Sequence, residues 1–234
     1  MLNSLTFYIY TSLCNLVLFI SNLIGFKTLK NLLEVSFDRQ KNNILIAAPN
    51  HIGIAFVEEG LISYRHIFDL ILHSTTYGVK RITFYDPWSR IKSDKSRFAK
   101  DLRKYLKHSS IIPIFNDDDT AEVVTNKRSI HISILGVNDG RGALVNVCKK
   151  LCHLSREIKI EDIDEELQQQ SIFEPDLLIK LGSIQSLAGY PPWSLRVTEI
   201  INLPSLSTST SNFTKSQFEE ILVNFSRRER RLGR

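Results

Sequence analysis

The feature that most constrains the fold is an alternation of short apolar runs with longer segments of helical periodicity. Apolar runs occupy residues 51–57, 79–86, 111–115, 129–136, 175–182 and 195–204, and helical spacing occupies 58–76, 93–108, 138–154 and 160–170. A continuous apolar run such as HIGIAFV, residues 51–57, is typical of a strand buried on both faces. The alternation predicts an α/β domain around a mostly parallel sheet flanked by helices. An amphipathic helix at 214–231, begun by Thr214, closes the chain.

The first 26 residues carry no charged side chain. Residues 5–26 include the ~20 residues that a helix needs to cross a bilayer, although a few polar side chains interrupt the run. A cleaved signal peptide would have a basic residue before the apolar run, and none is present. We therefore interpret residues 1–27 as a retained transmembrane anchor, residues 28–48 as a linker, and residues 49–234 as the folded domain.

Charge suggests the side of the membrane on which the domain lies. Lys27 and Lys30 directly follow the uncharged run, and by the positive-inside rule they predict a cytosolic domain. The sequons at Asn212 and Asn224 would be used only by a lumenal domain. The net charge of +5 favours anionic partners, but basic residues do not alternate with aromatic ones as an RNA-stacking surface requires.

Residue types that often carry chemistry are given structural roles by their context. Asp117, Asp118 and Asp119 are adjacent in a polar segment and predict a solvated loop, because neighbouring side chains seldom converge on one ion. His51 and His131 belong to predicted strands and have no second ligand at metal-binding spacing, so hydrogen-bonding roles are expected. No Walker, GxSxG or GxGxxG motif is present.

The three cysteines form no disulfide framework, which is typical of a reducing compartment. Cys148 and Cys152 stand one helical turn apart, and we interpret both as small core residues rather than as a metal or redox pair.

Several segments together carry a resemblance to a known family. They are HIGIAFVEE at 51–59, NDGRGAL at 138–144, PDLLIKLGSIQSLAGY at 175–190 and PPWSLRVTEI at 191–200. The pattern resembles the cis-prenyltransferases, which extend a prenyl diphosphate with isopentenyl diphosphate. The resemblance covers about residues 49–234 and implies the α/β fold of that family.

The first of these segments departs from the family where a catalytic aspartate holds Mg²⁺ on a diphosphate. Val57 occupies that position here. Glu58 and Glu59 follow, but one step along an extended strand turns a side chain to the opposite face. A self-sufficient transferase that uses Glu58 or Glu59 for its metal remains an alternative.

The later segment departs from the family in its diphosphate clamp. Lys180 replaces an arginine, Ile184 a glutamate and Ser186 a second arginine. An arginine grips phosphate with two parallel hydrogen bonds, which lysine reproduces poorly and serine cannot. We therefore expect this chain to be inactive alone, with no metal site and no catalytic residue of its own.

This pattern of loss resembles the accessory-subunit branch of the eukaryotic heteromeric enzyme, typified in animals by the Nogo-B receptor. The resemblance implies a complex with a catalytic dehydrodolichyl diphosphate synthase subunit at the endoplasmic reticulum membrane. That subunit would bind Mg²⁺ and farnesyl diphosphate, and the complex would make long-chain polyprenyl diphosphate for dolichol and protein glycosylation. A membrane-anchored receptor or adaptor built on a degenerate prenyltransferase scaffold is a further alternative.

The chain ends in RRERRLGR, and the branch ends in a short Arg-x-Gly tail. The resemblance implies that Arg231, Leu232 and Gly233 reach the partner's site and help bind isopentenyl diphosphate. An arginine supplies a permanent forked charge, and a glycine allows close approach of the backbone to the diphosphate. Arg141 and Glu199 match two further motif positions and are minor candidates for substrate binding.

Overall fold

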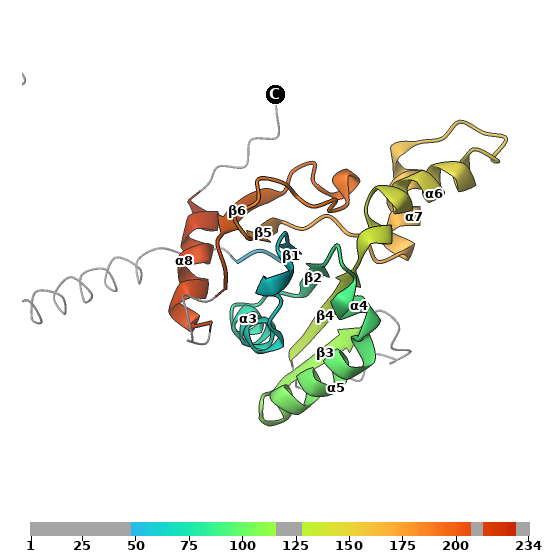
Figure 1. Cartoon of the computed structure of the whole chain (residues 1–234). Helices are drawn as coiled ribbons and strands as arrows, with labels where there is room; N and C mark the ends of the chain where they lie inside the picture. The colour runs from blue at the N-terminus through green and yellow to red at the C-terminus, as the bar shows by residue number, and fades with distance from the viewer. Residues whose placement is uncertain (1–47, 116–127, 207–212, 228–234) are drawn as a thin grey trace, which may run out of the picture. The chain divides into compact units, whose positions relative to one another are not determined.

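A computed structural model describes residues 48–115, 128–206 and 213–227. In this part of the chain a six-stranded sheet has the order β3-β4-β2-β1-β5-β6, and every adjacent pair is parallel (Figure 1). The strands are β1 (His51–Phe56), β2 (Arg81–Tyr85), β3 (Ile111–Phe115), β4 (Arg128–Leu135), β5 (Leu177–Leu181) and β6 (Glu199–Leu203). The predicted parallel α/β fold is therefore confirmed.

Six helices are described in the same part of the chain. They are α3 (Tyr64–Thr76), α4 (Arg90–Ser93), α5 (Lys95–Tyr105), α6 (Arg141–Leu151), α7 (Ile160–Gln169) and α8 (Lys215–Ser226). None of them is long and apolar enough to cross a bilayer. The predicted anchor at 1–27 and nearly all of the predicted linker lie outside the described residues.

Side chains alternate along each strand, so the sheet buries two separate cores. One lies under α3 and α5, where Phe84 of β2 packs edge-on to Phe98 of α5, and Phe98 packs edge-on to Phe68 of α3. Helix α8 also packs on α3. It begins as predicted at Thr214, whose hydroxyl accepts a hydrogen bond from the Gln217 backbone N–H and caps the helix.

The second core lies under α6 and α7. It joins side chains of four strands to a buried stripe on α6, and its strand residues are Ala55, Tyr85, Leu135 and Leu178. The α6 stripe is Ala143, Val147 and Leu151, and α7 adds Leu167. The helix predicted over 160–170 is present as α7, and its one buried side chain is that of Leu167.

The prediction that Cys148 and Cys152 are core residues is wrong, because both side chains are exposed. The buried stripe of α6 repeats every four residues through Val147 and Leu151. Each cysteine follows a stripe residue by one position, and one step along a helix turns a side chain by about 100°. The cysteines therefore lie beside the stripe and face solvent.

His51 links β1 to its neighbours and confirms the hydrogen-bonding role expected of it. Its Nδ1 lies 3.0 Å from the Glu174 carbonyl oxygen, and its Nε2 lies 2.8 Å from the Thr83 hydroxyl. Because a carbonyl only accepts, Nδ1 carries the proton and Nε2 accepts from Thr83. Burial, aided by the nearby Arg81 charge, lowers the pKa of His51 to about 4.

This depressed pKa predicts a loss of stability in acid. The folded chain keeps His51 neutral, whereas the unfolded chain binds a proton below about pH 6.5, so stability is full above that pH and falls toward pH 4. Between pH 7 and pH 4.5 we expect the His51 contribution to the free energy of unfolding to drop by about 2–3 kcal/mol. Urea unfolding of wild type and His51→Gln measures it, because the variant removes the titration.

Exposed His108 supplies the matched control. His108→Gln should keep the acid sensitivity of the wild type. The assignment of the acid sensitivity to His51 is wrong if the stability of His51→Gln depends on pH as steeply as that of the wild type. It is also wrong if an NMR titration gives the His51 ring a pKa above 6.

Candidate functional site

The carboxyl edge of the sheet holds the candidate site. From β1 the chain runs through α3 to β2 on one side, whereas β5 lies on the other side of β1. The order of the strands therefore reverses between β1 and β5, and open α/β sheets bind ligands beyond the carboxyl ends of strands at such a point. Val57 follows β1 there, and Lys180 to Ser186 end β5 and follow it.

Val57 is buried at this point and presents no polar group. Its side chain is 3% exposed, and its backbone N–H donates to the Leu181 carbonyl at 3.0 Å, which extends the β1–β5 pairing. A β-carbon at Gly182 would lie 2.7 Å from a Val57 methyl group. Gly182 also has φ +123, which disfavours other residues. The position at which the sequence predicts the loss of a metal ligand is thus filled by close apolar packing.

Glu58 is held by hydrogen bonds within the protein. One carboxylate oxygen, Oε1, accepts from the Ser183 N–H at 2.6 Å and from the Ser183 hydroxyl at 2.7 Å. These hydrogen bonds from Ser183 lower the pKa of Glu58. Glu59 instead pairs with Arg90 at 3.2 Å on an exposed surface.

The other carboxylates near this edge are also engaged by protein donors. Asp86 is fully buried and accepts from the Trp88 and Ile91 backbone N–H groups, both at 2.9 Å. Asp139 pairs with Lys92 at 2.5 Å. Within the described ranges, no group of three or more His, Cys, Asp or Glu residues could hold a metal. The described edge therefore does not fit the family's Mg²⁺.

The ammonium group of Lys180 is bonded to backbone carbonyl groups of its own loop. Only 7% of the residue is exposed, and its ammonium donates to the Ile184 carbonyl at 2.6 Å and the Gly182 carbonyl at 3.2 Å. The lysine therefore fastens its own loop, residues 182–190. Ile184 is 51% exposed, and the Ser186 hydroxyl accepts from the Ala188 N–H at 3.0 Å. No replaced clamp position offers a free cation.

A second contact holds this loop against the start of α6. A β-carbon on Gly140 would lie 2.2 Å from the Gly189 carbonyl oxygen, so the two backbones touch. Beside them the Tyr85 hydroxyl donates to the Ala188 carbonyl at 2.8 Å. Tyr85 also packs edge-on to buried Tyr190, with ring centres 5.4 Å apart. The loop is therefore held at both ends.

Several motif residues serve the opposite edge of the sheet. Asp176 Oδ2 accepts from the Asn50 and His51 backbone N–H groups at 2.8 and 3.1 Å, which fastens the start of β1 to the start of β5. Arg196 pairs with Asp164 of α7 and with Glu174, each at 3.3 Å. The motif residues Asp176 and Arg196 thus hold elements of the fold together.

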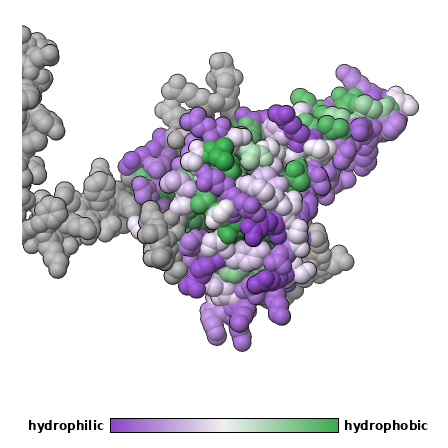
Figure 2. All heavy atoms as spheres, viewed as in Figure 1, coloured by the Kyte–Doolittle hydropathy of each residue, from purple (hydrophilic) through white to green (hydrophobic). Residues whose placement is uncertain are grey.

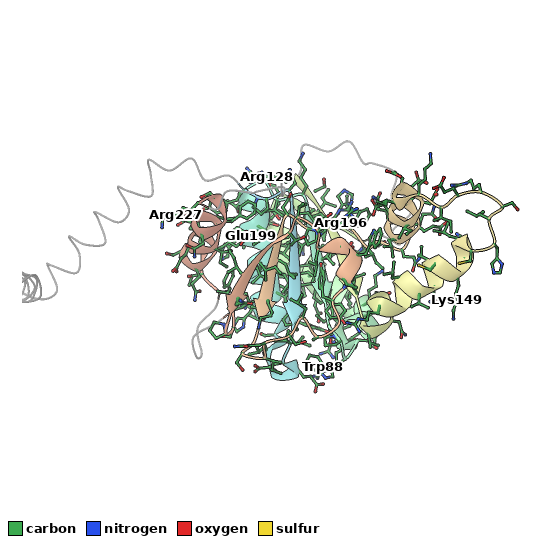
Figure 3. All side chains as sticks on the ribbon, turned by 90° about the horizontal axis from the view of Figure 1, so that it is seen from above. Trp88, Arg128, Lys149, Arg196, Glu199 and Arg227 are labelled. Atoms are coloured by element: carbon green, nitrogen blue, oxygen red, sulfur yellow. The ribbon has the colours of Figure 1, made fainter. Side chains whose placement is uncertain are left out.

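The two minor candidates are not brought together. Arg141 begins α6 near the carboxyl edge and is exposed. Glu199 begins β6 opposite Leu177, at the amino edge. Figure 3 shows the two ends of the sheet, since Trp88, which follows β2, lies at the end opposite Glu199 and Arg128. The tail candidates Arg231, Leu232 and Gly233, and the acidic run at 117–119, lie outside the described residues.

Sequence reasoning missed the partners that occupy this edge. Glu58 is 125 residues from Ser183, and Gly140 is distant in sequence from Gly189. Only Asp86 left a local signal, because an aspartate before Pro87 at a strand end often accepts from backbone groups a few residues on.

A family model for prenyltransferases of the undecaprenyl diphosphate synthase type matches residues 114–233, just over half of the chain. The chain belongs to this prenyltransferase family. The match runs from the end of β3 through the carboxyl-edge loop and into the tail. It confirms the resemblance drawn from the motifs.

Individual relatives agree with this assignment. The chain is 28% identical over 201 residues to the dehydrodolichyl diphosphate synthase complex subunit NUS1 of Homo sapiens, covering 80% of this chain and 67% of the relative. It is 29% identical over 218 residues to subunit nus1 of Schizosaccharomyces pombe, covering 83% and 81%. Lavandulyl diphosphate synthase from Lavandula x intermedia shares the fold, with TM-score 0.57 and 17% identity over 80% of this chain and 99% of that one.

Proposed function

We propose that this chain is the non-catalytic but required subunit of a heteromeric cis-prenyltransferase. Its partner is a catalytic dehydrodolichyl diphosphate synthase subunit, and their product is long-chain polyprenyl diphosphate for dolichol and protein glycosylation. The names of the relatives, which describe subunits of a dehydrodolichyl diphosphate synthase complex, support this role.

The state of the carboxyl edge carries the proposal. Val57 stands where the family has its metal ligand, Glu58 is bonded to Ser183, and Lys180 is bonded to carbonyl groups of its own loop. Releasing Lys180, which is 7% exposed, would leave a buried charge without a partner, which costs free energy. The edge supports a role as scaffold rather than as a second diphosphate site.

An exposed apolar surface supports contact with another subunit. The segment from α6 through α7, residues 141–169, projects beyond the sheet, and we name it the arm (Figure 1). Figure 2 shows hydrophobic residues gathered on it. Its exposed apolar side chains are Val145, Leu154, Ile158 and Ile160, which are 39–57% exposed. Apolar groups clustered on a surface are typical of a subunit interface.

The remaining parts of the proposal concern segments beyond the described residues. Residues 1–27 anchor the complex in the endoplasmic reticulum membrane with the domain on its cytosolic side. Arg231, Leu232 and Gly233 enter the partner's isopentenyl diphosphate site. Mg²⁺ and farnesyl diphosphate belong to the partner, since the described edge of this chain offers no free carboxylates for a metal.

An activity assay of the separate and combined subunits tests the proposal. The purified chain, given Mg²⁺, farnesyl diphosphate and isopentenyl diphosphate, should form no product above background. The catalytic partner should gain at least about tenfold in rate when this chain is added.

Each alternative has its own outcome in this assay. Turnover by the chain alone would support a self-sufficient transferase that uses Glu58 or Glu59. A partner that binds this chain but gains no activity from it would support the receptor or adaptor alternative.

A further inference from the structure

The outer face of α4 and α5 concentrates the positive charge of this protein. From Arg90 to His108 the chain has eight lysines and arginines and two aspartates, a net charge of +6. The whole chain carries only +5, so the rest of it is slightly acidic. These 19 residues form α4, α5 and the short 3₁₀ turn Leu106–His108, and all of them are described.

Helix geometry turns this charge to one side. The buried residues of α5 are Phe98, Ala99 and Leu102. With about 100° per residue, Lys100 and Lys104 lie on the opposite face of the helix. Both are exposed, and so is Lys107 in the following turn. Figure 2 shows the hydrophilic surface over this part of the domain, at the bottom of the view.

Some of these basic side chains form ion pairs with carboxylates, and others do not. Arg97 lies 3.9 Å from Asp94 and 3.7 Å from Asp101, Arg90 pairs with Glu59, and Lys92 pairs with Asp139. Among the described residues, no carboxylate pairs with Lys100, Lys104 or Lys107. Lys100 and Lys104 are also like charges at i and i+4, an arrangement that destabilises an isolated helix slightly. An external anion would relieve it.

We propose that Lys100, Lys104 and Lys107, here named the basic face, dock the domain on an anionic phospholipid bilayer. No large apolar side chain is exposed between Arg90 and His108, whereas the arm exposes several. A protein interface needs a buried apolar centre, so the basic face suits a diffuse array of negative headgroups better than a folded partner. Its exposed side also lacks an aromatic ring on which a nucleotide base could stack.

The proposed anchor makes this weak attraction effective, and in that respect the inference rests on the proposed function. Each lysine near an anionic surface contributes about 1 kcal/mol, too little to recruit a free protein firmly. Once residues 1–27 hold the chain at the bilayer, docking becomes an intramolecular event with a high effective concentration. The basic face then sets how the domain lies on the membrane.

Acetylation of lysines in the full chain, followed by mass spectrometry, tests the proposal. The chain is mixed with phosphatidylcholine vesicles or with vesicles containing 30 mol % phosphatidylserine, and the vesicles are sedimented. We expect Lys100, Lys104 and Lys107 to react at least about threefold more slowly on the anionic vesicles, and the protection to vanish in 0.5 M NaCl. Lys149, exposed on the arm (Figure 3), should react equally on both.

Charge-reversal variants separate a specific face from net charge. The triple variant Lys100→Glu, Lys104→Glu and Lys107→Glu should abolish any lipid-dependent change in the reactivity of neighbouring Lys95. The matched control Arg128→Glu, Lys149→Glu and Arg227→Glu changes three exposed residues spread over the domain by the same total charge (Figure 3). It should leave the protection of the basic face intact.

Failure of the anchor and failure of the basic face are distinguishable. Sedimentation with neutral vesicles reports the anchor alone. If the chain does not sediment with them, it should still sediment with anionic vesicles at low salt. The affinity of the basic-face variant for these anionic vesicles should be about tenfold lower. The proposal would be overturned if Lys100, Lys104 and Lys107 were acetylated equally fast on neutral and anionic vesicles. It would also be overturned if the control variant lost the protection of these lysines. So would protection of these lysines by added RNA but not by vesicles.

Discussion

Removing the last four residues should disable the assembled enzyme while leaving the subunits together. We expect deletion of residues 231–234, or Arg231→Ala alone, to lower the kcat/KM of the complex for isopentenyl diphosphate by about 100-fold. A guanidinium that pairs with a diphosphate contributes charge-assisted bonds worth roughly 1.5–3 kcal/mol, and its loss leaves anionic oxygens unpaired. Steady-state kinetics of the purified complex provides the measurement.

Neighbouring variants refine this tail prediction. Arg231→Lys should fall between wild type and alanine, because an ammonium keeps the charge without the fork. Gly233→Ala should cost about tenfold if the backbone approaches the diphosphate closely. Arg228→Ala removes the same charge three residues earlier and should have little effect. Full activity of the truncated complex, with subunit pairing intact on gel filtration, would refute the role of the tail.

The second large effect is expected at Gly140, where α6 meets the carboxyl-edge loop. A β-carbon there would lie 2.2 Å from the carbonyl oxygen of Gly189, so Gly140→Ala must push two backbones apart. A flexible side chain could move aside, but this neighbour is main chain and is held by the Tyr85 hydroxyl next to it. We expect the free energy of unfolding to fall by about 2–3 kcal/mol, measured by urea denaturation.

Gly142, in the first turn of α6, is the matched control. Nothing lies within 4 Å of a β-carbon at this position. Gly142→Ala should leave stability unchanged or raise it by up to about 1 kcal/mol, because alanine favours a helix more than glycine does. Equal stabilities for the two variants would show that the close contact of Gly140 with Gly189 does not constrain the domain.

The local sequence pattern predicted most of the strands and helices and their order along the chain. The runs at 51–57 and 111–115 became β1 and β3 almost residue for residue. β1 reads as a continuous apolar run because it is a parallel strand buried on both faces. Thr214 was identified as a helix start because its hydroxyl caps α8 within three residues. The helix expected over 58–76 begins only at Tyr64, after a short 3₁₀ turn at Glu59–Leu61.

Burial was harder to predict where periodicity allowed two answers. Cysteine is small and apolar, and 148 and 152 keep helical spacing, so a core position was reasonable. The spacing shows that both residues share a face, but the packing partner decides which face is buried. In α6 that partner is the cluster around Leu135 and Tyr85, which selects Val147 and Leu151.

The sequence alone determined the fold class and the family, and it predicts the loss of the metal-binding carboxylate, since each depends on residue identity at known spacing. It could not determine what Glu58 and Lys180 do instead. Their partners are Ser183, far away in the chain, and the carbonyls of a loop whose course depends on the contact between Gly140 and Gly189. Only the tertiary structure brings these groups within hydrogen-bonding distance, because such contacts are short in space and leave no periodic trace in the sequence.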